Sequence, residues 1–225
     1  GLTGTPLLGT DYNSRSLFGD YIHKYYYNAS IADGYTLRLI REDIQTNYKI
    51  ALQEALAQAE VKQGDVDKKI IYAHPTFVEP MLDYIIQDFE NSRGACNDST
   101  IGGMVICDSS EQAKQMFEIF NTKYKKEYDL SKVDISYTEH LKEKNKVKSA
   151  ALILHDVGDK QERKDLIDAF KAGKIDFLFV YNMLLTGFDA PRLKKLYIGR
   201  VIREHNLLQA LTRVNRTYKE FRYGY

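Results

Sequence analysis

Short runs of apolar residues alternate with longer amphipathic segments along the chain, and this alternation limits the possible folds more than any other feature. Apolar runs lie at Met104–Cys107, Ile175–Val180 and Leu193–Ile198. Runs of this kind are typical of buried parallel strands, because helices cover both faces of a parallel sheet. The alternation therefore predicts an α/β fold with a mostly parallel sheet flanked by helices.

Helices are predicted where apolar residues recur at helical spacing, where helix-forming residues predominate, or where capping residues precede a suitable stretch. Phe77–Phe89 carries apolar residues at four-residue steps, and Ser109 and Ser110 supply a cap before Glu111–Tyr124. The predicted helices are Ile44–Val61, Phe77–Phe89, Glu111–Tyr124, Glu162–Lys171 and Asn206–Tyr218.

The remaining predicted elements are two further strands, a hairpin and a loop. The turn signal Asp33-Gly34 predicts a hairpin formed by the segments on either side of it. The stretch Asn91–Gly103 is rich in Gly, Asn and Ser, which predicts a loop. The strands are predicted at Lys69–Ala73, which Pro75 ends, and at Val133–Tyr137, and the hairpin at Tyr25–Ile31 and Tyr35–Ile40.

The composition excludes several classes of protein. Hydrophobic residues make up 44% and charged residues 28% of the 225 residues, which is typical of soluble globular domains. No run approaches 18 apolar residues and no secretory signal is present, so we expect a cytoplasmic protein with no membrane partner. Cys96 and Cys107 are too few for a disulfide framework, and the five histidines are too scattered for zinc, so no metal site is expected.

Positive charge is concentrated at the end of the chain. The net charge is +1, yet residues 1–100 hold 9 basic and 14 acidic residues, and residues 101–190 hold 14 and 15. Residues 191–225 hold 9 basic and 2 acidic residues, a balance of +7. Such a stretch suggests a polyanion such as nucleotide phosphate or nucleic acid, and a solvated basic helix face is the alternative.

Two motifs lie in predicted loops. Thr3-Gly4-Thr5-Pro6 forms a tight turn whose hydroxyls and amides can bond phosphates or carboxylates, although many loops share this pattern. In the stretch 182–191, Gly187 permits close backbone approach and Asp189 supplies a carboxylate. The alternative for that stretch is an ordinary turn with an Asx hydrogen bond.

A third motif places Gln209, Arg213 and Arg216 on a predicted helix. Their spacing of four and then three residues puts them on one helix face. Arginine suits bidentate phosphate contacts and the stabilisation of a transferring phosphoryl group, and a solvated basic face is again the alternative. Because ligands of parallel sheets bind at the carboxyl ends of the strands, we expect the chemistry in the loops after Cys107, Val180 and Gly199.

In this order and spacing the motifs resemble a known family. Thr3–Pro6, Met104–Cys107 with its cap, the stretch 185–191 and Gln209-x3-Arg213-x2-Arg216 look like motifs III, IV, V and VI of superfamily 2 helicases. Met-Leu-Leu-Thr-Gly-Phe-Asp-Ala-Pro followed by His-x-Leu-Leu-Gln-Ala-Leu-x-Arg-x-Asn-Arg resembles the motor (R) subunit of type I restriction endonucleases. The resemblance covers nearly the whole chain. It departs at Gly199–Arg203, where the family has an acidic-Lys-Pro pattern, and this leaves Arg200 without an assigned role.

The resemblance implies a nucleotide role for five residues. Arg213 and Arg216 would stabilise the γ-phosphate of ATP, and Gln209 would help to position the nucleotide. Gly187 and Asp189 would lie at the edge of the nucleotide. The ATP would bind between two RecA-like domains, of which this chain would supply the second.

The resemblance also implies a DNA role and a domain division. Thr186 would lie near the DNA backbone, and Thr3 and Thr5 would couple the ATP site to DNA movement. The fold would be RecA-like with three layers and an N-terminal extension. Residues 1–10 would end the first RecA-like domain, residues 11–100 would form a family-specific linking region, and residues 101–225 would form the second RecA-like domain.

An absent motif limits what the chain can do alone. No Gly-x4-Gly-Lys-Ser/Thr sequence and no Asp-Glu-x-His box occur, although a P-loop is what cradles the phosphates and helps to hold Mg²⁺. We therefore expect ATP and Mg²⁺ to act only in a longer protein, which a start without methionine also indicates.

The resemblance implies double-stranded DNA, methyltransferase and specificity subunits, and N-terminal nuclease and first RecA-like domains as partners. The alternatives are the C-terminal domain of another superfamily 2 helicase and a non-catalytic module that binds nucleic acid.

Overall fold

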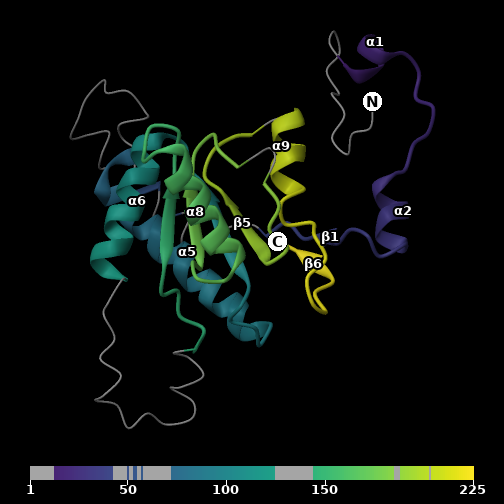
Figure 1. Ribbon diagram of the computed structural model, residues 1–225. Coiled ribbons are helices and arrows are strands. Elements are labelled where there is room, and N and C mark those ends of the chain that lie inside the picture. The colour runs from purple at the N-terminus through teal and green to yellow at the C-terminus, as the bar shows by residue number, and fades with distance from the viewer. Residues whose placement is uncertain are drawn as a thin grey trace.

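The structure is a computed structural model that describes residues 13–42, 50, 53–54, 57, 72–124, 144–184, 188–202 and 204–225. In this part of the chain, residues 13–42 form an N-terminal extension with two short helices and a strand. The rest alternates helices with strands (Figure 1). In chain order the named elements are α1 (Ser14–Phe18), α2 (Tyr27–Ala32), β1 (Arg38–Leu39), α5 (Pro75–Ala95), β2 (Gly102–Ile106), α6 (Ser110–Lys123), β3 (Ala150–Ile153), α8 (Lys160–Lys171), β4 (Phe177–Val180), β5 (Leu193–Ile198), α9 (Glu204–Leu211) and β6 (Tyr223–Gly224).

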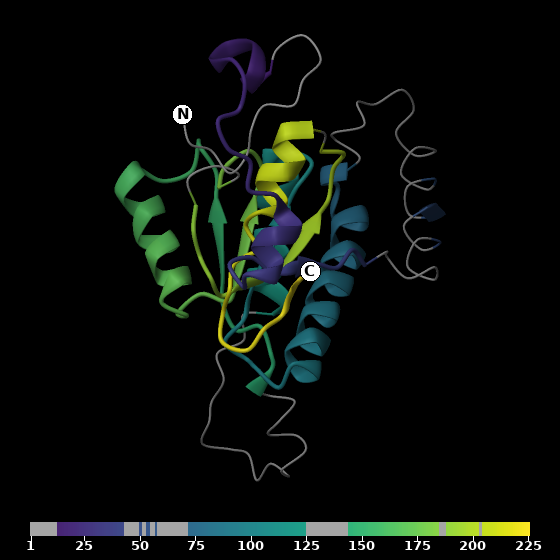
Figure 2. The ribbon, with the colours of Figure 1, turned by 90° about the vertical axis from the view of Figure 1, so that its right-hand side faces the viewer.

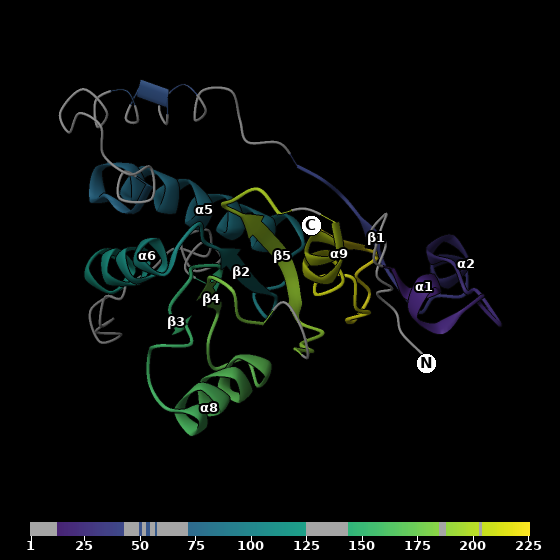
Figure 3. The same cartoon turned by 90° about the horizontal axis from the view of Figure 1, so that it is seen from above.

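Among the described residues, four parallel strands form the main sheet, in the order β3-β4-β2-β5. Helices α5 and α6 lie on one side of this sheet and α8 lies on the other, as the view from above shows (Figure 3). The chain thus has the predicted α/β architecture, a RecA-like fold of three layers. A second, two-stranded sheet joins β1 to β6 in parallel and ties the N-terminal extension to the end of the chain.

The alternation of side chains along the buried strands produces these layers. Val105, Phe177 and Phe179 pack with α5 and α6, and the rings of Phe179 and Phe120 lie 6.1 Å apart. Met104 and the other alternate residues of β2 and β4 pack toward α8 and α9. All five residues of β2 are buried, because helices cover both faces of the sheet.

Two buried arginines stabilise the amino ends of the strands. Arg93 in α5 is 1% exposed and donates to the carbonyls of Ile101, at 2.9 Å, and Lys146, at 3.0 Å. Its Nη2 also donates to Asp176 Oδ1 at 2.7 Å. Arg192 similarly donates to three backbone carbonyls, so the two side chains pair carbonyl groups that would otherwise be buried without partners.

The structure confirms several predicted elements and extends others. Helix α6 begins after the Ser109 cap, whose hydroxyl accepts the Gln112 N–H at 3.1 Å. Helix α8 ends at a positive-φ glycine, Gly173, as its sequence indicates. The predicted loop at residues 91–103 is wrong at both ends, because α5 continues to Ala95 and β2 begins at Gly102.

The predicted hairpin around Asp33-Gly34 is wrong. Residues 27–32 form helix α2, and Gly34 follows it with a φ of 77°. A glycine just after a helix produces the same turn signal as a hairpin, since both need a positive φ. The strand that follows, β1, pairs with β6 near the other end of the chain.

Other element predictions are wrong in part or lie outside the described residues. Residues 72–73 are helical rather than the end of a strand, and Pro75 begins α5 with His74 as its cap. Strand β3 was not predicted, although Ala150–Leu154 is an apolar run of the kind used to predict the other strands. The helix at 44–61 lies mostly outside the described residues, and the strand at 133–137 entirely so.

The N-terminal extension lies beside α9 and the C-terminal segment, away from α6 and α8 (Figures 1 and 2). The Leu37 N–H donates to Asn215 Oδ1 at 2.7 Å, and the Ile40 N–H donates to the Gly224 carbonyl at 2.8 Å. These bonds join segments that are far apart in the sequence. Among the described helices none is both long enough and apolar enough to span a bilayer.

Candidate functional site

The segment that follows α9, residues 212–216, carries the two predicted phosphate-binding arginines and is called the arginine segment below. A helix was predicted here, but the segment is not helical. Helix α9 ends at Leu211, so Arg213 and Arg216 lie beyond it. The Gln209 carbonyl accepts the Thr212 hydroxyl at 2.8 Å and the Arg213 side chain at 3.1 Å. The Arg213 N–H donates to the Ala210 carbonyl, three residues back, rather than to the Gln209 carbonyl at α-helical spacing. The two arginines therefore do not share a helix face with Gln209.

The Arg213 guanidinium is half-buried and is used within the domain. Its Nη1 donates to the Phe188 carbonyl, and its Nη2 donates to Thr212 Oγ1 at 3.3 Å. Burial lowers the pKa of Arg213, the nearby charge of Arg216 lowers it further, and Asp189 opposes both. Arg213 thus anchors the loop that carries Asp189 onto the segment after α9.

Arg216 lies at the surface and forms an ion pair with Asp189. Arg216 Nε is 3.3 Å from Asp189 Oδ1, and the side chains are 49% and 61% exposed. The structure therefore brings the second and third sequence motifs together at one exposed position. A pair this exposed contributes little to stability and leaves the guanidinium accessible to a stronger anionic ligand.

The other predicted site residues are less well placed by the structure. Gln209 is half-buried in α9, adjacent to the arginine segment. Thr3, Thr5, Thr186 and Gly187 lie outside the described residues, so their predicted roles stay predictions.

The arginines lie toward the amino ends of the strands rather than the carboxyl ends. The Arg216 carbonyl accepts Lys194 Nζ, near the start of β5, and the Tyr218 hydroxyl lies 2.8 Å from that of Thr100, just before β2. Helix α9 runs back along the sheet, which carries the residues after it away from the carboxyl edge (Figure 1). Arg213 and Arg216 therefore lie away from the carboxyl edge, where the chemistry is expected from the sequence, although their partners Asp189 and Phe188 belong to the loop after Val180.

The carboxyl edge holds a different polar pair. Arg200 follows β5, and its Nη2 donates to Asn182 Oδ1, after β4, at 2.8 Å. The Arg200 guanidinium also stacks 4.7 Å from the centre of the Tyr181 ring, and its Nε is buried without a hydrogen-bond partner among the described residues. These contacts join two of the loops in which sequence reasoning expected chemistry.

Two residues that support the arginine segment were missed by the sequence analysis. Asn215, 6% exposed, bonds the N-terminal extension through Leu37. Lys194 is 1% exposed and donates to the Arg216 carbonyl. Burial lowers the pKa of Lys194 from 10.5 to about 8. The one signal in the sequence was the pair Lys194-Lys195 in a strand otherwise rich in apolar residues. The contacts of Asn215 and Lys194 depend on distant segments, so local patterns do not predict them.

The lowered pKa of Lys194 predicts that the stability of the protein depends on pH. Its folded pKa lies below its unfolded pKa, so the unfolded chain holds more protons between pH 8 and 10.5 and stability should rise with pH there. Lys194→Met removes this contribution. We expect the variant to be no less stable than the parent at pH 7, with its relative stability falling as pH rises to 9.5. Urea unfolding of both proteins from pH 7 to 9.5 gives the difference between their free energies of unfolding. The contributions of other titrating groups cancel in this difference. A constant difference would contradict the assignment.

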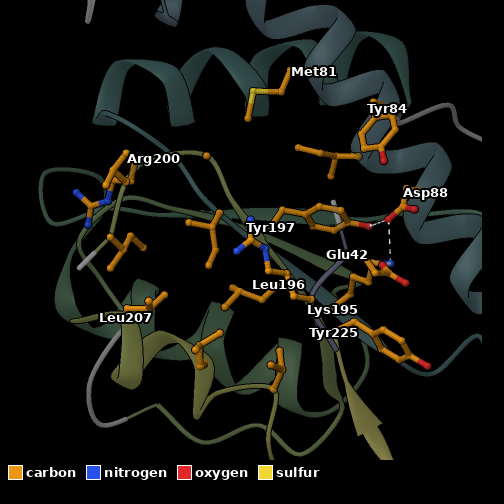
Figure 4. Close-up of a pocket in the computed structure, with 18 of the residues that line it drawn as sticks. Glu42, Met81, Tyr84, Asp88, Lys195, Leu196, Tyr197, Arg200, Leu207 and Tyr225 are labelled. Carbon is orange, nitrogen blue, oxygen red and sulfur yellow. Dashed lines mark hydrogen bonds and ion pairs between the residues drawn. The ribbon is translucent and has the colours of Figure 1, made fainter. Parts of the chain in front are cut away.

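A cavity of about 980 Å³ lies beside β5, between α5 and α9 (Figure 4). Lys195 contacts Glu42 from the extension and lies 3.1 Å from Asp88 Oδ2, to which the Tyr197 hydroxyl also donates at 2.7 Å. Burial alone would lower the pKa of Lys195, but its bonds and charge interactions with Glu42 and Asp88 raise it overall. Gln209, Asp189 and the two arginines do not line this cavity, although Leu207, Leu211 and Val214, from α9 and the segment after it, do.

Comparison with known proteins identifies the family. A family model described as type I restriction enzyme subunit R domain 3 matches residues 20–225. The chain belongs to this family. The resemblance drawn from the motifs is thereby confirmed, and the match includes Asp189, Gln209, Arg213 and Arg216.

This R-subunit domain is also similar to curated proteins over most of its length. It is 25% identical over 229 residues to the type I restriction enzyme HindI endonuclease subunit of Haemophilus influenzae, covering 97% of this chain and 21% of that protein. It is 25% identical over 261 residues to the putative MjaVIIIP endonuclease subunit of Methanocaldococcus jannaschii, covering 100% of this chain and 25% of that protein.

A shorter match is closer in sequence. The R-subunit domain is 53% identical over 47 residues to the putative MjaVIIP endonuclease subunit of the same archaeon, covering 21% of this chain and 4% of that protein. The chain spans a quarter or less of the length of these relatives.

Proposed function

We propose that this R-subunit domain is the second motor domain of an ATP-dependent translocase of double-stranded DNA. Within a type I restriction enzyme it supplies arginines to an ATP site shared with a first RecA-like domain. The observation that carries the proposal is the exposed ion pair of Arg216 with Asp189, beside the half-buried Arg213.

The geometry of the group suits a shared phosphate site. An arginine that stabilises phosphoryl transfer must reach beyond its own domain, and Arg216 is exposed, with a surface carboxylate as its one ion-pair partner in the described part of the chain. A nucleotide phosphate carries more charge than a carboxylate and presents similar oxygen atoms, so it competes effectively for the guanidinium. Asp189 then holds Arg216 in position until the nucleotide arrives.

Arg213 and Arg216 have different roles in this proposal. Three of the Arg213 donors already serve groups of this domain, so this side chain mainly fixes the loop before β5. Arg216 has an exposed side chain and is the stronger candidate for direct phosphate contact. Gln209, beside them in α9, and Gly187 complete the proposed nucleotide edge.

The remaining partners belong to the complete enzyme. We place Thr3, Thr5 and Thr186 toward DNA and the coupling of DNA movement to ATP hydrolysis. The first RecA-like domain provides the P-loop and the Mg²⁺ site that the 225 residues lack. Methyltransferase and specificity subunits, and a nuclease domain in the same subunit, complete the assembly, which works in the cytoplasm.

The domain alone is expected to show no ATP hydrolysis above background, with or without double-stranded DNA. No P-loop sequence occurs in the chain, so half of the ATP site is missing. Phosphate release assays on the purified domain measure this, with the complete R subunit as the active control. DNA-stimulated hydrolysis by the domain alone, abolished by Arg216→Ala, would show a self-contained site and refute the shared one.

A further inference from the structure

Strand β5 has an irregularity at its start that changes the direction of a lysine side chain. Leu193 pairs with Gly102 and Lys195 pairs with Gly103, so Lys194 is an extra residue between two consecutive pairs. An extra residue of this kind is a β-bulge, and bulges re-aim side chains near functional sites. Lys195 extends toward α5 and the cavity, whereas the Lys194 ammonium group reaches the segment after α9.

The Lys194 ammonium group is buried in a place that does not favour a charge. Its side chain is 1% exposed, and no carboxylate pairs with it among the residues that the structure describes. Its contacts are the Arg216 carbonyl and the ring of Tyr218, whose centre lies 5.9 Å away. A buried cation without a carboxylate opposes folding, so stability does not explain this lysine.

The contact it makes lies directly at the proposed phosphate-binding arginine. The Arg216 backbone follows the end of α9, where helical hydrogen bonds no longer fix the chain. Arg213 and Asn215 are anchored by Phe188 and Leu37, but neither bond reaches the Arg216 carbonyl. Lys194 is the residue that holds this carbonyl.

We propose that Lys194 is a positioning residue for Arg216. By holding the Arg216 carbonyl it sets the point from which the guanidinium reaches Asp189 and, in the working motor, the nucleotide phosphate. The proposal rests on the proposed function, because it assigns Lys194 a part in ATP turnover through Arg216. Lys194 itself touches no nucleotide in this arrangement.

A double-mutant cycle in the complete R subunit tests the proposal. Lys194→Met keeps most of the side-chain length and removes its donor, and we expect it to lower kcat for ATP by about 10²-fold with little change in KM. In the Arg216→Ala background Lys194→Met should have no further effect, because both changes remove the same contribution. Lys194→Gln, which keeps a donor one atom short, should give an intermediate rate.

Lys195→Met is the matched control, since it changes the neighbouring lysine on the other side of β5. It leaves Glu42 and Asp88 without their cation, so we expect a lower thermal midpoint and an effect on the rate that is additive with Arg216→Ala. Lys194→Met should not lower the midpoint. Hydrogen exchange should become faster at residues 214–217 in Lys194→Met but remain unchanged in the central sheet.

The outcomes separate the two proposals. A normal rate for Lys194→Met beside an inactive Arg216→Ala would overturn the positioning role and leave the proposed function standing. A further loss of rate in the double variant, or a fall in the thermal midpoint like that of Lys195→Met, would also overturn it. A normal rate for Arg216→Ala would refute the proposed function, and the role of Lys194 with it.

Discussion

Replacing Arg216 with alanine in the complete R subunit should lower kcat for DNA-stimulated ATP hydrolysis by about 10³-fold, the low end of the effect of an arginine finger. The thermal midpoint should change little, because Arg216 and its partner Asp189 are 49% and 61% exposed. The KM for ATP should change less than kcat, since the guanidinium acts mainly on charge that develops during phosphoryl transfer. Steady-state hydrolysis with saturating DNA, together with thermal unfolding, measures both quantities.

Three further variants define the specificity of this effect. Arg222→Ala removes an exposed arginine from the same basic stretch and should leave the rate unchanged. Arg216→Lys should remain strongly impaired, because an ammonium group lacks the planar fork that matches phosphate. Arg213→Ala should lower both the rate and the thermal midpoint, because Arg213 anchors the Phe188 carbonyl. An Arg216→Ala subunit with the parental rate would refute the shared ATP site.

Replacing Arg93 with methionine should destabilise the domain by about 3 kcal/mol, the loss typical of removing one partner from a buried ion pair. The change leaves the carbonyls of Ile101 and Lys146 and the Asp176 carboxylate without their shared donor. Methionine retains most of the aliphatic volume, so the loss reports the polar contacts rather than a cavity. Urea unfolding monitored by far-UV circular dichroism gives the free energy of unfolding.

Lys114→Met is the matched control for Arg93. It breaks an ion pair with Asp156 whose side chains are 43% and 55% exposed, and such pairs contribute roughly 0–1 kcal/mol. Equal losses for the two variants would show that the carbonyls near Arg93 find water when the guanidinium is removed. That result would contradict the role assigned to Arg93 at the amino ends of the strands.

Sequence reasoning succeeded where burial repeats along a single segment. The apolar runs at β2, β4 and β5 and the apolar face of α5 follow directly from the periods of strands and helices. It failed where one signal has two structural meanings. Asp33-Gly34 looked like a hairpin turn but follows a helix, and the 209–216 spacing looked like one helix face although α9 ends at Leu211.

The candidate site was predicted residue by residue but not in its arrangement. Asp189 and Arg216 come from separate motifs, and the resemblance places both near the nucleotide without predicting the ion pair that joins them. Arg213 was expected to face phosphate, and the structure instead uses three of its donors inside the domain. These differences arise because a side chain binds whichever acceptors the packed backbone places within reach.

By itself the sequence determined the strands β2, β4 and β5, the α/β class and the membership of the R-subunit family, because these depend on local periodicity and on short motifs. Only the tertiary structure decided that Lys194 sits in a bulge beneath Arg216 and that Leu37 bonds Asn215, 178 positions away. Contacts of this kind depend on how the sheet, α9 and the extension pack together. No local pattern encodes them, since each segment alone would leave these polar groups in water.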